Sequence, residues 1–229
     1  MNAEADIDFE TIRISMDTKA TVDVGDYSRY GRSRGLKPVK ALDHDMRPKE
    51  KLVPGGILEP VSGRSFIFFT GSNKTSDFMV DGLMLWWNKR KQDLPNVKRI
   101  VLNMDNGPEC SGRRTQFLKR MVDFSDSTGL TVHMAYCPPY HSKYNGIERY
   151  WAGLEKSWNG YLLSTVCVVL NRASNFVWKK VPTIVQLLDT TYAKGVKLFG
   201  KERQQIEERL KRSSKLPLYD ITINPITVF

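Results

Sequence analysis

Residues 101–109 read VLNMDNGPE, and this stretch decides the fold that the sequence predicts. The apolar run at residues 100–102 is typical of a buried strand, and Asp105 follows closely after it. The Asn-Gly-Pro sequence that comes next breaks the strand. We therefore expect the Asp105 carboxylate at the carboxyl end of a strand, on the rim of a sheet.

A second stretch, residues 137–158, reads CPPYHSKYNGIERYWAGLEKSW. After two prolines and a polar turn, the apolar side chains fall on one face of a predicted helix: Ile147, Trp151, Leu154 and Trp158. Asn145 suits the N-cap of this helix, and Glu148 lies beside the apolar face in its first turns. An acid at a strand end and an acid on a later helix can converge, which is the layout of a carboxylate metal site.

A third acid, Asp17, ends an alternating pattern at residues 12–17 that predicts a half-buried strand. Residues 21–25 predict a second strand, close enough to pair with the first as a hairpin. Taken alone, Asp17 is more typical of a tight turn. Its position at a strand end makes it a candidate ligand.

The rest of the chain predicts alternating elements. Residues 64–70 and 130–136 are typical of strands, and residues 75–91 and 113–128 of helices. Early strands joined without helices favour an antiparallel meander, and later strands alternating with helices favour parallel additions to the same sheet. If the first and fourth strands are neighbours, Asp17 and Asp105 lie side by side. Residues 161–229 predict a mostly helical extension with an extended tail from residue 216.

Composition limits the class of protein. The chain has 229 residues, 41% of them hydrophobic, and 35 Lys and Arg against 25 Asp and Glu, a net charge of +10 that favours a polyanionic partner. The three cysteines lack CxxC spacing, which argues against a disulfide framework or a structural zinc site. With no run of 18 apolar residues and no signal-peptide pattern, we expect a soluble, cytoplasmic protein without membrane contact.

Two segments concentrate basic charge. Residues 29–51 and residues 194–215 each hold eight Lys and Arg against three acids. The first predicts a long loop, part of an insertion at about residues 29–62, and its candidate DNA contacts are Arg32, Arg34, Lys37 and Lys40. A solvated loop and, for the second segment, an exposed helix with i,i+4 ion pairs are the structural alternatives. Asp43, His44 and Asp45 resemble a metal cluster, but a structural or DNA-positioning role suits this basic loop better.

In these contexts the acids resemble those of a known family. Asp17 in ISMDTK, Asp105 in NMDNGPE and Glu148 in YHSKYNGIERYW resemble the three acids of the insertion-sequence DDE transposases, relatives of retroviral integrases with a ribonuclease H-like catalytic domain. KALDHDM, TSDF and PPYHSKYN extend the resemblance from about residue 12 to LPLYDITI. The spacing between Asp105 and Glu148 is slightly longer than is common in the group. Gly146 stands where the family often has proline, which implies a looser start to the helix.

The resemblance implies a fold and a domain organisation. The fold is α/β, a ribonuclease H-like mixed five-stranded sheet with flanking helices plus a helical C-terminal extension, divided into a catalytic domain (1–160) and an extension (161–229). Family members carry a helix-turn-helix region before the catalytic domain, and only about eleven residues precede the first strand here. We therefore expect a truncated chain that lacks this region.

The resemblance also implies the chemistry. We expect two Mg²⁺ ions, for which Mn²⁺ can substitute, with Asp17 bridging both and Asp105 and Glu148 each holding one. Water would first cleave a DNA strand at the element end, and the freed 3′-hydroxyl would then attack target DNA. His141 and Lys143 either contact the scissile phosphate or shape the turn, and Glu155 is an alternative to Glu148.

The expected partners are DNA and further copies of the chain at the bacterial nucleoid. Two other functions stay open. One is a catalytically idle regulatory remnant that competes with an intact transposase, and the other is a ribonuclease H-like nuclease or resolvase.

Overall fold

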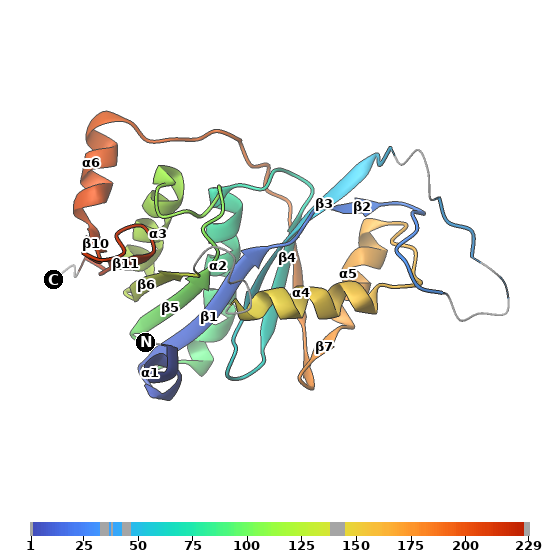
Figure 1. Cartoon of the computed structure of the whole chain (residues 1–229), viewed down its shortest axis with the longest axis horizontal. Coiled ribbons are helices and arrows are strands. Elements are labelled where there is room, and N and C mark those ends of the chain that lie inside the picture. The colour runs from blue at the N-terminus through green and yellow to red at the C-terminus, as the bar shows by residue number, and fades with distance from the viewer. Residues whose placement is uncertain (1, 33–36, 38, 43–46, 138–144, 227–229) are drawn as a thin grey trace.

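The computed structural model in Figure 1 describes residues 2–32, 37, 39–42, 47–137 and 145–226. Within them a mixed sheet has the strand order β10-β11-β6-β5-β1-β3-β4-β9, with β2 paired to β3. The strands of this sheet are β1 (Thr11–Thr18), β2 (Val22–Val24), β3 (Glu50–Leu58), β4 (Ser65–Thr70), β5 (Arg99–Met104), β6 (Thr131–Tyr136), β9 (Ile184–Leu188), β10 (Leu210–Arg212) and β11 (Asp220–Ile223). A separate hairpin joins β7 (Val177–Trp178) and β8 (Val181–Pro182).

The helices are α1 (Asn2–Ile7), α2 (Ser76–Arg90), the 3-10 turn η1 (Lys91–Asp93), α3 (Thr115–Thr128), α4 (Gly146–Ser157), α5 (Val166–Ser174) and α6 (Gly200–Glu208). The five strands β4-β3-β1-β5-β6 form the mixed ribonuclease H-like sheet that was predicted. In it β3 is antiparallel to both of its neighbours in this set, and β5 is parallel to both of its own. The α/β class with flanking helices is confirmed, and the sheet extends beyond five strands at both edges.

Two apolar cores cover the two faces of this sheet. Side chains alternate along β4, so Phe66 and Phe68 enter one core while Ile67 and Phe69 enter the other. The first core contains the apolar faces of α2 and α3, and the second contains those of α4 and α5. In Figure 1 α4 crosses in front of the strands. The catalytic candidates on β1 and α4 therefore meet on the α4 face.

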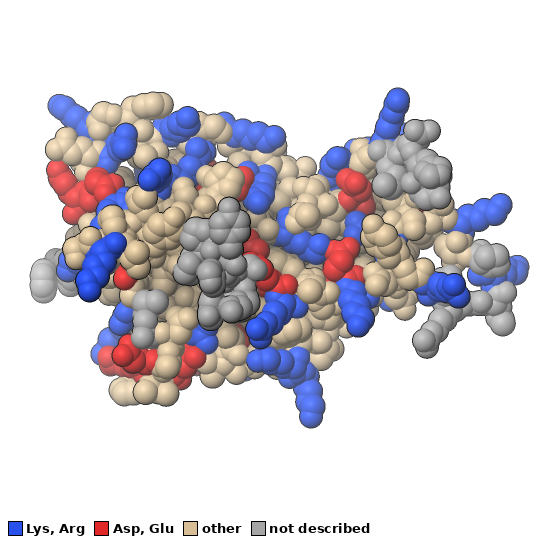
Figure 2. Space-filling view, viewed as in Figure 1, with Lys and Arg blue, Asp and Glu red and all other residues tan. Residues whose placement is uncertain are grey.

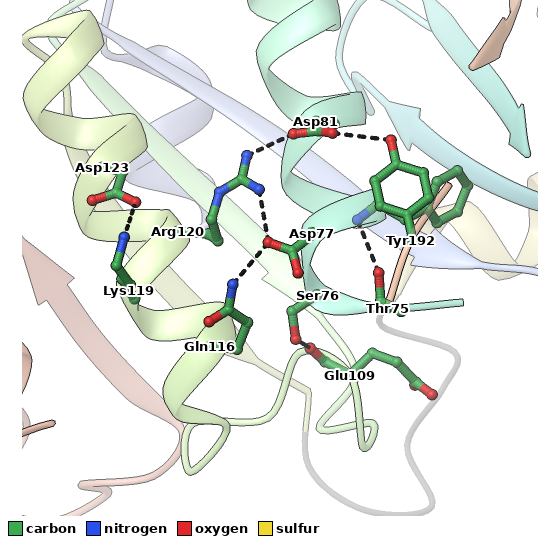
Figure 3. A network of polar contacts seen from close by, with 11 residues as sticks. Thr75, Ser76, Asp77, Asp81, Glu109, Gln116, Lys119, Arg120, Asp123 and Tyr192 are labelled. Carbon is green, nitrogen blue, oxygen red and sulfur yellow. Dashed lines mark hydrogen bonds and ion pairs between the residues drawn. The ribbon is translucent and has the colours of Figure 1, made fainter. Parts of the chain in front are cut away.

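Polar side chains fix where α2 and α3 lie. The Thr75 hydroxyl accepts the Phe78 amide and begins α2, and Gly129, with φ of 71°, ends α3 in the left-handed conformation. The guanidinium of Arg120 on α3 donates to Asp77 at 2.7 Å and to Asp81 at 2.6 Å, both on α2 (Figure 3). These contacts join the two helices that cover the first core.

One predicted pairing is wrong. The strand at residues 21–25 exists as β2, but it pairs antiparallel with β3 rather than forming a hairpin with β1. The true antiparallel neighbour of β1 is β3, with Asp17 opposite Gly56. This long strand lies inside the segment that was predicted as an irregular insertion.

The sequence of β3 explains why it was missed. It contains Pro54, Gly55 and Gly56, residues that ordinarily interrupt a strand. Here the glycines make room for rings, because a Cβ at Gly55 would lie 2.4 Å from the Phe68 ring and one at Gly56 2.6 Å from the Trp151 ring. Gly56 thus lets α4 pack close to the strand beside Asp17.

The segment after residue 160 is not mostly helical. Residues 184–188, predicted as helix, form β9 parallel to β4. The periodicity of such a short apolar run fits either a helix or a strand, and pairing with the edge strand β4 makes it a strand. The predicted extended tail contributes β11, which pairs with β6. The division into two domains at residue 160 stays a prediction.

Among the described residues, no helix is long and apolar enough to cross a membrane.

Candidate active site

Asp17 and Asp105 lie at the same edge of the sheet, where two neighbouring parallel strands end. The β1–β5 register pairs Ser15 with Asn103, and two residues further along come Asp17, within β1, and Asp105, the first residue after β5. Strand alternation places the Asp17 carboxylate on the face that carries α4, since Met16 belongs to the opposite core, and Asp105 directly follows β5, the strand beside β1. This confirms the strand adjacency on which the sequence prediction depended.

The start of α4 is fastened to β1 through Ser15. The buried Ser15 hydroxyl accepts the backbone N–H of Ile147 at 3.2 Å and donates to the side-chain oxygen of Asn145. Asn145 occupies the predicted N-cap position, but its side chain makes no capping bond, and the serine of the neighbouring strand caps the helix instead. Glu148, one residue beyond Ile147, is half-buried in this first turn.

The loop after Asp105 is held at several points. The Cys110 thiol donates to the Asp105 carboxylate at 3.5 Å, and burial raises the pKa of this thiol well above its usual range, so it stays a neutral donor. The Tyr136 hydroxyl donates to the Cys110 carbonyl at 2.6 Å. Ser76 of α2 donates to the Glu109 carbonyl at 2.6 Å (Figure 3). Asp105 itself is exposed at the rim.

Electrostatic coupling shows that the acids share one neighbourhood. Burial and, after it, the charge of Asp105 raise the pKa of Asp17 to about 7, with a smaller contribution from Glu148, while the Thr18 amide and Lys74 act in the opposite direction. Burial also raises the pKa of the Cys137 thiol, with Glu148 and Asp105 adding to the effect. The charges of Asp105 and Glu148 both disfavour the charged form of Asp17, and a bound cation would relieve that repulsion.

The chemistry of this donor set fits a hard divalent ion. Carboxylate oxygens are the ligands that Mg²⁺ and Mn²⁺ prefer, and Asp105 and Glu148 reach the solvent-facing edge from separate elements. As the side chains stand, no group of three or more His, Cys, Asp or Glu in the described part of the chain is closed into a metal-holding arrangement. The acids are therefore neighbours that an ion would have to draw together.

Glu155, the alternative to Glu148, has other partners. It forms ion pairs with Lys19 and, at 3.2 Å, with Arg29, whose guanidinium also lies 5.6 Å from the centre of the Trp158 ring. Glu155 thus anchors the beginning of the basic segment on α4. This pairing favours Glu148 as the third acid.

The predicted DNA contacts are only partly described. Arg32, Lys37 and Lys40 are exposed, whereas Arg34, His141 and Lys143 lie outside the described residues, as do Asp43, His44 and Asp45. Figure 2 shows Lys and Arg side chains spread over the visible face among smaller groups of acids. Basic surface is therefore available for DNA, and the individual contacts stay predictions.

Two residues near the acids carried no signal in the sequence analysis. Ser15 is one of many serines in the chain, and its role depends on a partner 132 residues away. Lys74 precedes α2, and its charge reaches Asp17 only because β4 and β1 end at the same edge. Neither could be found without the strand order.

Comparison with known families places the chain among transposase domains. The family model described as the Rhodopirellula transposase DDE domain matches residues 2–225. The comparison with curated proteins gives no match.

Among solved structures, the Mos1 transposase paired-end complex with left transposon end is 9% identical with a TM-score of 0.48, covering 70% of this chain and 46% of that one. The Mos1 mariner paired-end complex with Mn is 9% identical with a TM-score of 0.46, covering 70% and 45%. The chain thus matches less than half the length of these proteins.

Proposed function

Because the chain belongs to the Rhodopirellula DDE transposase domain family, we propose that Asp17, Asp105 and Glu148 are its catalytic acids and that it cleaves and joins DNA strands. The observation that carries the proposal is the adjacency of Asp17 and Asp105 on β1 and β5, with the first turn of α4 tied to β1 by Ser15. One acid on a strand, one after the next strand and one on a helix thereby share one rim.

DDE transposases generally use divalent metal ions, and we propose two Mg²⁺ ions for this site, with Mn²⁺ as a substitute. Asp17 would contact both ions, and Asp105 and Glu148 would each hold one. When bound, the ions would activate the attacking hydroxyl and neutralise charge on the leaving 3′-oxygen. Because acids held close together repel one another without a cation, we expect the activity to depend on the metal.

The chain's own residues supply the geometry of the reaction. The Thr18 amide donates to the Asp17 carboxylate at 2.7 Å and fixes its orientation, and Cys110 does the same for Asp105. Ser15 holds the helix turn that presents Glu148. Binding at element ends, assembly as a homo-oligomer on DNA and a location at the bacterial nucleoid stay predictions from the family.

A strand-transfer assay tests the proposal. A labelled duplex with a free 3′-hydroxyl is incubated with supercoiled plasmid and Mn²⁺, and the joined product is measured for wild type and Asp105→Asn. We expect joining by wild type and at least a hundredfold loss in the variant, as for removal of an essential catalytic group. Failure to join, combined with cleavage of RNA–DNA hybrid, would favour the nuclease alternative. Failure of both reactions would favour the idle remnant.

A further inference from the structure

A cavity of about 580 Å³ opens at the same sheet edge as the acids. The cavity is lined by Thr21, which follows β1, by residues 71–74, which connect β4 to α2, and by Glu109, which lies in the loop after Asp105. These segments follow the carboxyl ends of β1, β4 and β5, which is the rim where ligands bind in open α/β sheets. The cavity therefore adjoins the proposed active site.

Four lysines line the cavity against one acid: Lys49, Lys51, Lys74 and Lys194. Lys74 lies 3.6 Å from Glu109, and Lys51 lies 3.5 Å from Asp23 in an exposed pair that contributes little stability. Lys49 and Lys194 are exposed, and neither forms an ion pair within the described part of the chain. The lining thus carries net positive charge that internal pairing does not neutralise.

Lys74 places positive charge of the cavity lining next to the proposed catalytic acids. Lys74 pairs with Glu109, which lies in the loop that begins at Asp105. Lys74 lies near the acids, and Lys49 and Lys194 line the same cavity without ion-pair partners among the described residues. This row of positive charges suits a polyanionic ligand that extends from the active site into the cavity. A polynucleotide backbone is such a ligand.

The size of the cavity favours single-stranded over duplex DNA. A volume of about 580 Å³ lies in the range of sites for small ligands, about 300–1,000 Å³, so a duplex is too large and one or two nucleotides of a single strand fit. We propose that this lysine cavity binds the phosphate backbone of the single DNA strand next to the bond that is cleaved, an inference that rests on the proposed function. Lys49, Lys74 and Lys194 would contact successive phosphates.

Salt-dependent binding tests this proposal separately from catalysis. Anisotropy of a labelled single-stranded oligonucleotide is measured in EDTA, where no cleavage occurs, for wild type and the double variant Lys49→Gln/Lys194→Gln. We expect about tenfold weaker binding and a salt slope smaller by about 1.4, since each lysine–phosphate contact contributes about 0.7 for single strands. Lys49→Arg/Lys194→Arg keeps the charge and should bind as wild type does.

The matched control is Lys211→Gln/Lys215→Gln, which removes two exposed lysines at the β10 edge of the sheet. An equal loss in the control, or an unchanged slope in the cavity variant, would overturn the proposal. A loss confined to duplex oligonucleotide would also overturn it, because the cavity is assigned to a single strand. An inactive wild type that still shows the lysine-dependent slope would overturn the proposed function and leave the binding site standing.

Discussion

The hydroxyl of Ser15 accepts the backbone N–H of Ile147 at 3.2 Å, across a separation of 132 residues in the chain. Ser15 lies two residues before Asp17 on β1, and Ile147 lies one residue before Glu148 on α4. A single buried hydrogen bond therefore connects the strand that carries one acid to the helix turn that carries another. The relative position of the two carboxylates depends on it.

Removing this hydroxyl should loosen the site. In Ser15→Ala the Ile147 amide and the Asn145 side-chain oxygen lose a buried partner, which costs about 1–3 kcal/mol of folding stability. Because Glu148 is then held less firmly, kcat for strand cleavage should fall more than KM rises. Thermal unfolding and cleavage kinetics measure the two effects.

Ser157→Ala is the control for this variant, because the Ser157 hydroxyl at the other end of α4 bonds, within the part of the chain that the structure describes, only to the Leu154 carbonyl of the same helix. It should leave kcat unchanged. If both serine variants lost kcat equally, the role assigned to Ser15 would be wrong.

Gly56 sets the distance between α4 and the sheet. In Gly56→Ala the new methyl group would meet the Trp151 ring at 2.6 Å, so the helix must shift and the protein should lose about 1–3 kcal/mol. Among the described residues, the new methyl group of Gly146→Ala, in the first turn of α4, meets no atom closer than 3.6 Å, so this variant should be neutral or stabilising by up to about 1 kcal/mol. Chemical denaturation compares the two, and equal stabilities would contradict the packing described here.

The pKa of Asp17, raised from 3.8 to about 7, makes the metal-free protein less stable at alkaline pH. The penalty is absent below the unfolded value of 3.8, grows as the pH rises, and is complete above 7, where it reaches the order of 4 kcal/mol. Asp17→Asn, which mimics the protonated acid, should therefore stabilise the protein more at pH 8 than at pH 5. Unfolding in EDTA at both pH values tests this, with the exposed Asp123→Asn as a control that should show no such difference.

Divalent metal should reverse that penalty. An ion bound by the acids favours their charged forms and stabilises the folded state, by about 2.7 kcal/mol at a concentration a hundred times Kd. We expect Mn²⁺ to raise the Tm of wild type at pH 7.5 and to raise that of Asp17→Asn and Asp105→Asn much less. Equal increases in all three proteins would place the ion elsewhere.

The sequence predicted what local patterns determine. The apolar runs of β1, β4, β5 and β6 and the helices expected at residues 75–91 and 113–128 are confirmed because each depends on neighbouring residues. The adjacency of Asp17 and Asp105 was expected only if the first and fourth strands were neighbours, and the pairing of β1 with β5 confirms that they are. These signals suffice for the α/β class and for the rim on which the acids lie.

The features that were missed depend on distant partners. The Pro-Gly-Gly sequence of β3 opposes strand formation locally and is accommodated by Phe68 and Trp151. The β9 and β11 strands exist because β4 and β6 offer unpaired edges to them. Ser15 and the lysine cavity are assembled from segments that only the folded topology brings together.

The most direct test of the three-acid site is nicking of supercoiled plasmid in Mn²⁺ by wild type, Glu148→Gln and Glu155→Gln. The two glutamates lie on the same helix, but Glu155 is paired with Lys19 and Arg29. We predict metal-dependent nicking by wild type, retention of most activity in Glu155→Gln and loss of at least a hundredfold in Glu148→Gln. Nicking by Glu148→Gln at the wild-type rate would contradict the assignment of Glu148 as the third catalytic acid.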